Sequence, residues 1–316
     1  MKKQIFSILL TLLCVSLTAC DVSTPSTPSS VAGYPYTFTD AQGDTVSLTA
    51  PPKRVAVLFS SFAEMWQLAG GTVSVTVAES VSRGLVSADV TLVDSGAGHT
   101  DINREALLAA KPDFVIGTAD FAGQADAVSF CRSVGIPAAV FRVENVSQYV
   151  DTLKIFCDIT NNPTAYQTYG VDVETKVSHI LGSVKTPQNP PKILFIRTGS
   201  STRSTKAKIA DNHYVCAMLK ELGTKNIAEN TPLLQGDFSL EAVIQHDPAY
   251  IFISTMGNDA AATAYMQDTL KTEGWSTLSA VQNNRVIFLP RDLFHYKPNA
   301  RWGEAYAYLA EILYTE

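Results

Sequence analysis

The residue types that could carry out chemistry form no recognisable catalytic or metal-binding pattern. The five histidines are His99, His179, His213, His246 and His295, and none lies four residues from another histidine or from a cysteine. A zinc site on a helix needs such a spacing. The chain also lacks the Gly-x-Ser-x-Gly nucleophile turn and the phosphate-binding loop of nucleotide hydrolases. The sequence therefore predicts a binding protein rather than an enzyme, with no metal site and no cofactor.

Candidate ligand contacts follow the predicted β-strands, because ligands of parallel sheets bind beyond the carboxyl ends of the strands. Arg83, Arg203 and Lys206 suit an anionic ligand, since a guanidinium offers several donors in a fixed fork. Phe121, Phe294 and Tyr296 offer flat apolar surface. The complete set of candidate contacts is Ser60, Ser61, Arg83, His99, Thr118, Phe121, Arg203, Lys206, Met256, Phe294, His295 and Tyr296.

Each candidate also has a plainer explanation that the sequence leaves open. The basic residues can be solvated loop charges, and the aromatic rings can be ordinary packing. His295 or Tyr296 is the candidate for an axial haem ligand, but a surface or core position explains them better. Ser61 and Glu64 have the spacing of a capping box, which explains them better than ligand contact does.

The elements that position these residues alternate between apolar runs and helical periods. Strands are expected at 55–59, 73–77, 91–93, 114–117 and 138–143 in the first half, and at 193–196, 250–254 and 286–289 in the second. Helices are expected between them, and a β-hairpin at 36–48 precedes them. Such alternation predicts an α/β fold with parallel sheets covered on both faces.

A long helix separates the two halves. Asn162 and Pro163 provide the preferred cap and first helical residue, and Pro187 ends the pattern. The apolar stripe, spaced by three and four, is Tyr166, Tyr169, Val173, Val177, Ile180 and Val184. We therefore expect an N-terminal lobe at 34–160, an interlobe helix at 161–186 and a C-terminal lobe at 187–316.

A faint internal repeat relates the halves. The pattern around Glu105, Pro112 and Phe114 recurs around Glu241, Pro248 and Tyr250 at a constant offset of 136 residues. Each copy predicts a capped helix, a proline turn and a buried strand. Two copies in register predict two similar α/β lobes, whose cleft is the natural ligand site.

The N-terminus has the pattern of a secretory signal peptide, with Lys2 and Lys3 before an apolar run that is too short to span a bilayer well. Leu17-Thr18-Ala19-Cys20 resembles the lipobox of bacterial lipoproteins, which implies cleavage after residue 19 and lipidation of Cys20. Residues 20–33 then form a flexible tether. An ordinary signal peptide with a chance cysteine is the alternative.

Composition limits the remaining function classes. The chain has 316 residues, a formal net charge of −6 and 46% hydrophobic residues, which argues against both nucleic-acid binding and disorder. Its five cysteines are too few for a disulfide scaffold. Cys131 and Cys157 are expected either as buried free thiols or, outside the cytoplasm, as a disulfide.

Several stretches together resemble the class III solute-binding proteins of ABC importers for ferric siderophores, haem and cobalamin. They include Pro51-Pro-Lys-Arg-Val55, Glu105-Ala-Leu-Leu-Ala-Ala-Lys-Pro-Asp113, Val134-Gly-Ile-Pro137 and Pro298-Asn-Ala-Arg-Trp302. The resemblance covers about 34–314. It implies two Rossmann-like lobes bridged by one long helix, and a largely preformed ligand site.

The resemblance also implies partners and a location. Glu105 and Glu241 match the glutamates that dock each lobe onto arginines of a permease dimer, which works with an ATPase, although acids also suit a first helical turn. We expect a monomer on the outer face of a bacterial cytoplasmic membrane, held by its lipid anchor. A ferric siderophore is the preferred ligand, with cobalamin and then haem as alternatives. An anchored enzyme or a sensory or adhesive lipoprotein on the same fold is the further alternative.

Overall fold

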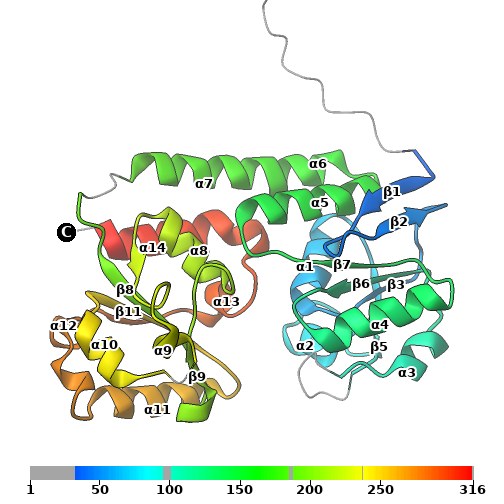
Figure 1. Cartoon of the computed structure of the whole chain (residues 1–316). Helices are drawn as coiled ribbons and strands as arrows, with labels where there is room; N and C mark the ends of the chain where they lie inside the picture. Colours follow the sequence, from blue (N-terminus) through cyan, green and yellow to red (C-terminus); the bar gives the residue numbers. More distant parts are fainter. Residues whose placement is uncertain (1–32, 95–100, 185–187, 237, 315–316) are drawn as a thin grey trace, which may run out of the picture. The chain divides into compact units, whose positions relative to one another are not determined.

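Two parallel β-sheets, each with helices on both faces, organise the chain (Figure 1). The computed structural model describes residues 33–94, 101–184, 188–236 and 238–314, which belong to one compact unit. We call the described residues before 161 the N-terminal lobe and those after 187 the C-terminal lobe. The two sheets confirm the predicted α/β fold with two lobes.

The N-terminal sheet has the strand order β5-β4-β3-β6-β7, and all five strands run parallel. Its strands are β3 (Val55–Val57), β4 (Val73–Thr76), β5 (Thr91–Leu92), β6 (Phe114–Thr118) and β7 (Ala138–Phe141). Its helices are α1 (Ser60–Leu68), α2 (Ala78–Ser82), α3 (Arg104–Ala109), α4 (Ala122–Ser133) and α5 (Val146–Thr160). The predicted hairpin precedes them as β1 (Tyr36–Thr39) and β2 (Thr45–Leu48).

Side-chain alternation along β3 explains how helices cover both faces of this sheet. Val55 and Val57 join an apolar cluster with residues of α1 and α5, whereas Ala56 joins a second cluster with residues of α4. Strands covered on both faces need continuous apolar runs. All five residues of β6 are buried, in agreement with this requirement.

The C-terminal sheet has the order β10-β8-β11-β12 in parallel, with β9 antiparallel to β8. Its strands are β8 (Lys192–Thr198), β9 (Thr205–Ala207), β10 (Lys225–Asn226), β11 (Tyr250–Thr255) and β12 (Val286–Phe288). Its α-helices are α8 (Tyr214–Glu221), α9 (Pro232–Gln235), α10 (Leu240–His246), α11 (Asp259–Leu270), α12 (Ser279–Gln282), α13 (Arg291–Phe294) and α14 (Trp302–Tyr314). Short 3-10 turns are η2 (Thr202–Ser204), η3 (Trp275–Thr277) and η4 (Asn299–Arg301).

The bridge between the lobes is the predicted helix, with a different hydrogen-bond pattern in its middle. It consists of α6 (Pro163–Tyr166), a π-helical turn η1 (Gln167–Val171) and α7 (Asp172–Ser183). Asn162 caps it by accepting a hydrogen bond from Ala165 N at 3.1 Å. A π-turn inserts a residue into the helical ladder, so the apolar stripe shifts around the helix without breaking it.

The last helix, α14, packs along α7 (Figure 1). At Gly303 of α14, a Cβ would lie 2.6 Å from Cδ of Lys176 in α7, so a larger residue would displace the lysine side chain. One apolar cluster continues from α1 and α5 through Val173 and Val177 to Trp302 and Tyr306. The bridge is therefore part of a packed core rather than a bare connection.

The capping box predicted for Ser61 and Glu64 is wrong. The N-cap of α1 is Phe59, which has no capping side chain, and Ser61 lies inside the helix. Both predicted members are engaged elsewhere, because Ser61 Oγ accepts a hydrogen bond from Lys297 N and Glu64 pairs with Arg83. The tertiary partners therefore replace the local motif.

The disulfide alternative for Cys131 and Cys157 is also excluded, because both thiols are free and buried. They belong to different apolar clusters, on opposite faces of the N-terminal sheet. Burial raises the pKa of Cys131 to about 11 and that of Cys157 to about 12. Both side chains thus behave as small apolar residues.

Candidate ligand-binding site

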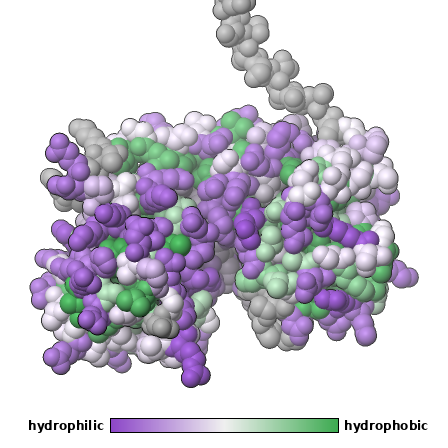
Figure 2. All heavy atoms as spheres, viewed as in Figure 1, coloured by the Kyte–Doolittle hydropathy of each residue, from purple (hydrophilic) through white to green (hydrophobic). Residues whose placement is uncertain are grey.

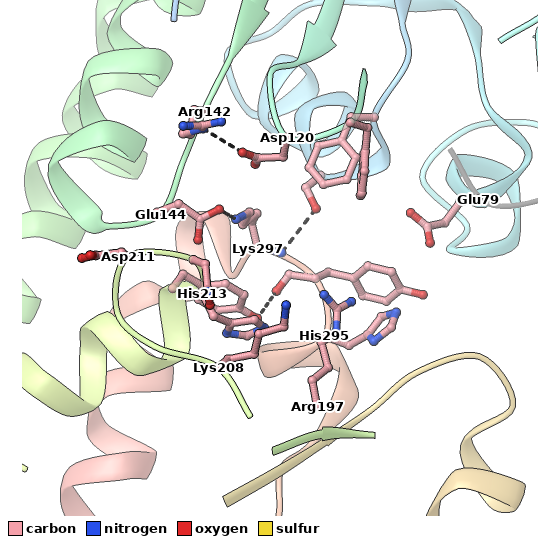
Figure 3. Close-up of a pocket in the computed structure, with 16 residues that line it drawn as sticks. Glu79, Asp120, Arg142, Glu144, Arg197, Lys208, Asp211, His213, His295 and Lys297 are labelled. Atoms are coloured by element: carbon pink, nitrogen blue, oxygen red, sulfur yellow. Dashed lines mark hydrogen bonds and ion pairs between the residues drawn. The ribbon is translucent and has the colours of Figure 1, made fainter. Parts of the chain in front are cut away.

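A cavity of about 390 Å³ lies beyond the carboxyl ends of strands from both sheets (Figure 3). In each sheet, successive strands are added first toward one edge and then toward the other. This change occurs between β3 and β6 in the N-terminal sheet and between β8 and β11 in the C-terminal sheet. Ligands of open α/β sheets bind at such reversals. The cavity is lined by Phe59, Ser61, Glu79, Asp120, Phe121, Arg142, Glu144, Arg197, Lys208, Asp211, Asn212, His213, Tyr214, His295, Tyr296 and Lys297.

The acidic residues on the N-terminal side of the cavity are already partnered. Arg142 Nε donates to Asp120 Oδ1 at 2.8 Å, and Lys297 Nζ donates to Glu144 Oε1 at 2.6 Å. The third acid, Glu79, accepts a hydrogen bond from the hydroxyl of Ser60. Asp120 and Glu144 are thus each paired with a cation, although Glu144 Oε2 is buried without a hydrogen-bond partner among the described residues.

Two aromatic rings complete that wall. Phe59 and Phe121 meet edge to face with their ring centroids 5.9 Å apart. Phe59 follows β3 and Phe121 follows β6, so each ring stands at a strand end of the N-terminal sheet. The pair offers an apolar surface beside the ion pairs.

Two cations of the C-terminal lobe, Arg197 and Lys208, line the cavity and form no ion pair with the described residues, although Glu144 lies near enough to raise the pKa of both. Arg197 lies near the end of β8, and Lys208 directly follows β9, which pairs with β8. Arg197 Nε is buried without a hydrogen-bond partner among the described residues. Burial lowers the pKa of both side chains, and the Arg197 charge lowers the pKa of Lys208 further. Burial of a cation without an ion pair costs free energy, which Glu144 offsets only in part.

His213 stands beside these cations as a neutral ring. Burial, together with the charges of Arg197, Lys297 and Lys208, holds its pKa well below the usual value. Its Nδ1 accepts a hydrogen bond from Val215 N at 3.3 Å and so caps α8. Figure 3 places His213 with Arg197 and Lys208 on one side of the cavity, opposite Asp120 and Arg142.

Residues 295–299, which we call the strap, contact both lobes. The hydroxyl of Tyr214, in the C-terminal lobe, donates to Tyr296 O at 2.7 Å. In the N-terminal lobe, Ser61 Oγ accepts from Lys297 N at 3.3 Å and Ser61 O accepts from Asn299 Nδ2 at 2.9 Å. The lobes are thus tied at the cavity as well as by the helix. Figure 2 shows hydrophilic side chains gathered where the lobes meet.

Several residues expected at the site from the sequence lie at or beside the cavity. Ser61, Phe121, His295 and Tyr296 line it. Ser60 lies directly behind the wall, where it hydrogen-bonds Glu79 and Arg83. Thr118 is buried, and its hydroxyl accepts a hydrogen bond from Asp120 N at 3.2 Å, which steadies the loop carrying Asp120.

Other expected contacts do not line this cavity. Arg83 pairs with Glu64 instead, and Lys206 donates to Gly236 O at 3.0 Å. Arg203 lies in the exposed turn η2. Phe294 is fully buried, and Met256, after β11, lies outside the lining as well. His99 lies outside the described residues.

The structure adds site residues that the sequence did not single out. Arg142 and Glu144 follow β7, so the rule that placed the other contacts at strand ends could have found them. Arg197 directly follows the strand expected at 193–196 but was not singled out, and the observed strand β8 extends through it. Lys208 to His213 precede α8, and their approach to the cavity depends on the small strand β9, which the sequence did not predict.

The two docking candidates occupy equivalent positions in the two lobes. Glu105 lies in the first turn of α3, which Asn103 caps by accepting from Ala106 N at 2.9 Å. Glu241 lies in the first turn of α10, which Ser239 caps in the same way at 3.3 Å. Both glutamates are exposed.

Within the described residues, no group of three His, Cys, Asp or Glu side chains could hold a metal ion. Nor does any helix among them have the length and apolar character to cross a bilayer. The described part of the chain thus presents a polar, charged cavity between two α/β lobes.

A family comparison decides the relationship of this chain to known proteins, because residues 55–293 match the model of the periplasmic binding protein family. The chain belongs to that family. A cobalamin-binding protein of Halobacterium salinarum is 25% identical over 235 residues, which is 73% of this chain but 62% of the relative. An uncharacterised ABC transporter substrate-binding lipoprotein of Bacillus subtilis, YvrC, is 24% identical over 290 residues, covering 90% of this chain and 87% of the relative.

Solved periplasmic binding proteins share the fold. An ABC transporter substrate-binding protein from Listeria monocytogenes superposes with a TM-score of 0.68 at 17% identity, covering 84% of this chain and all of that one. The haem-binding protein RhuT from Roseiflexus superposes with a TM-score of 0.67 at 19% identity, covering 83% and 98%. At these identities the likeness concerns the two-lobed fold.

Proposed function

We propose that this chain is the substrate-binding protein of an ABC importer and that it captures an anionic iron chelate of the ferric siderophore type. Arg197 and Lys208, which line the cavity and form no ion pair with the described residues, support the choice of ligand class. Carboxylate or catecholate oxygens of a chelate would accept hydrogen bonds from both side chains. Membership of the periplasmic binding protein family supports a binding role over a catalytic one.

The shape and lining of the cavity agree with such a ligand. A volume of about 390 Å³ is in the lower part of the range of roughly 300–1,000 Å³ for small-molecule sites. Phe59, Phe121 and Tyr296 add flat surface against which a rigid chelate can pack. The strap and the helical bridge favour a preformed site, and a preformed site lowers the ordering cost of binding.

Cobalamin is the second candidate, because one of the sequence relatives is named a cobalamin-binding protein. Haem is the third, favoured by the structural likeness to RhuT and by the presence of His295 and Tyr296 in the lining. Cobalamin does not explain the two cations as directly as a multiply anionic chelate does, whereas the two propionates of haem would also pair with them, so the binding screen decides between haem and a chelate.

Delivery and location complete the proposal. We propose that Glu105 and Glu241 dock the two lobes onto arginines of a permease dimer, which an ATPase powers. A signal peptide at 1–19 and lipidation of Cys20 would hold the protein outside the cytoplasmic membrane as a monomer on a tether. The lipoprotein relative YvrC supports the anchor. The end of α5 at Thr160 and the start of β8 at Lys192 support lobe boundaries near 160 and 187.

A binding screen tests the proposal. Purified protein starting at residue 21 is titrated with ferric citrate, a ferric tris-catecholate, cyanocobalamin and haemin, with intrinsic Trp and Tyr fluorescence as the readout. We expect at least one ferric chelate to saturate with micromolar or tighter affinity, which is about −8 kcal/mol or better. Saturation by cyanocobalamin or haemin alone would transfer the proposal to that ligand, and failure of all four would refute it.

A further inference from the structure

Arg83 and Tyr296 form a contact between the lobes at the edge of the cavity. The Arg83 guanidinium lies over the Tyr296 ring, 4.1 Å from its centroid. Arg83 follows α2 in the N-terminal lobe, whereas Tyr296 lies in the strap after α13. Tyr296 lines the cavity, and Arg83 does not.

The other contacts of Arg83 hold its guanidinium in this position. Nη2 donates to Glu64 Oε2 at 2.6 Å, and Nη1 donates to Ser60 Oγ at 3.1 Å. The side chain is only 12% exposed. Two of the five N–H donors are engaged and Glu64 compensates the charge, so the guanidinium presents little net charge to an anionic ligand. A planar guanidinium fixed along its edge keeps its face available for stacking.

The position of the Tyr296 side chain is set by contacts of its ring. Its backbone oxygen is anchored by the Tyr214 hydroxyl, but its side chain is held by ring contacts with Arg83 and His295, whose ring centroid lies 4.7 Å away. Cation–π contacts orient a ring without a hydrogen bond. Loss of the guanidinium would leave the ring free to change rotamer at the cavity wall.

We propose that Arg83 is a positioning residue of the ligand site: it acts through the Tyr296 ring, which it holds across the lobe boundary, and not on the ligand. This inference rests on the proposed binding function. It differs from the expectation from sequence that Arg83 contacts an anionic ligand directly.

The first test needs no ligand. Hydrogen–deuterium exchange is followed in peptides covering the strap and, for comparison, α4. Arg83→Lys keeps a charge near Glu64 but loses the planar stack, so we expect strap exchange about three- to tenfold faster with α4 unchanged. Arg104→Lys is the matched control, since Arg104 lies over the Phe130 ring at 5.5 Å, away from the cavity. Unchanged strap exchange in Arg83→Lys would overturn the proposal.

The second test is a double-mutant cycle of Arg83→Lys and Tyr296→Leu, measured with whichever of the four screening probes saturates the parent. Each single variant should weaken binding about three- to tenfold. The double variant should be no weaker than Tyr296→Leu alone, and Tyr296→Phe should bind like the parent because it keeps the ring. If the fold-changes in dissociation constant of the two single variants multiply in the double variant, Arg83 acts independently of Tyr296, which would overturn the proposal.

The two proposals fail in different ways. If no probe binds the parent, the proposed function is refuted, while strap exchange still decides whether Arg83 holds Tyr296. If a probe binds and the affinity losses of the two single variants multiply in the double variant, the binding function stands and the positioning role of Arg83 is refuted.

Discussion

Lys111 and Asp247 adopt the same left-handed backbone conformation, with φ angles of 49° and 43°, although neither is a glycine. The two residues lie at the same offset as the internal repeat. Each follows a short capped helix, α3 or α10, and precedes a proline that leads into β6 or β11. Non-glycine residues rarely adopt positive φ, so the shared conformation shows that the two copies have the same turn. This turn sets Glu105 and Glu241 at equivalent places in their lobes.

The equivalence of the two glutamates leads to a prediction about delivery. Glu105→Lys combined with Glu241→Lys should abolish uptake and leave ligand affinity within a few-fold of the parent. Like charges brought together at an interface cost several kcal/mol, and the substituted lysines would face permease arginines. Uptake into cells and ligand titration of the purified protein measure the two effects.

Two other exposed glutamates provide the control for this pair. Glu174 lies on α7 and Glu273 follows α11, and both are exposed. The same double change to lysine there should leave uptake intact. Normal transport by the Glu105 and Glu241 double variant would contradict the docking assignment.

Arg197 should dominate the affinity for an anionic chelate. Arg197→Gln should weaken it by about 1.5–3 kcal/mol, the range for hydrogen bonds to charged groups, which is roughly ten- to a hundredfold. The variant should unfold at the same temperature as the parent or higher, because it removes a buried cation without a partner. Arg203→Gln is the matched control, since Arg203 does not line the cavity. An equal loss of ligand affinity in Arg197→Gln and Arg203→Gln would indicate that the ligand binds outside the described cavity.

His213 should make stability depend on pH. Its pKa in the folded protein is well below the usual value, whereas an unfolded histidine titrates near about 6.5. As the pH falls below that value, the unfolded state gains a proton that the folded state does not. Folding stability therefore decreases by up to about 1.4 kcal/mol per pH unit, or roughly 2 kcal/mol between about pH 6.5 and pH 5.

The variant His213→Asn tests that dependence. Asparagine keeps an acceptor for Val215 N at the start of α8 and does not titrate. Urea unfolding of parent and variant at several pH values should give a shallower loss of stability for the variant on the acid side. If the free energy of unfolding of parent and variant falls equally with decreasing pH, His213 does not cause the loss of stability.

Cys20, outside the described residues, should carry the lipid anchor. Cys20→Ser should leave the protein in the aqueous phase after detergent partitioning of cell extracts, because serine has no thiol to acylate. Cys14→Ser is the matched control within the apolar run of the signal peptide and should partition like the parent. Detergent-phase recovery of Cys20→Ser would contradict the lipoprotein assignment.

The sequence predicted the fold well because its signals are local. Strands such as β6 are continuous apolar runs, and Asn162-Pro163 begins the bridge where the structure places it. Helix α11 was missed because alanines form much of it, and only Ala262 and Met266 are buried, so its apolar period is weak.

The site was harder to predict because tertiary partners decide it. Arg83 was expected in a loop after a strand but caps the end of α2, and Glu64 and Ser60 turn its side chain toward Tyr296. Arg197 directly follows the strand expected at 193–196, but the antiparallel strand β9, which places Lys208 near it, was not expected. No local pattern encodes either arrangement.

Uptake of radioactive iron tests the central claim most directly. Cells lacking this gene receive the parent, Arg197→Gln or Arg203→Gln, and uptake of the iron chelate that binds in the screen is measured at a concentration near its dissociation constant. Full uptake is expected with the parent and Arg203→Gln, and a loss of at least about fivefold with Arg197→Gln, because an affinity about tenfold weaker lowers occupancy about fivefold at this concentration. Undiminished uptake with Arg197→Gln, or in cells without the gene, would contradict it.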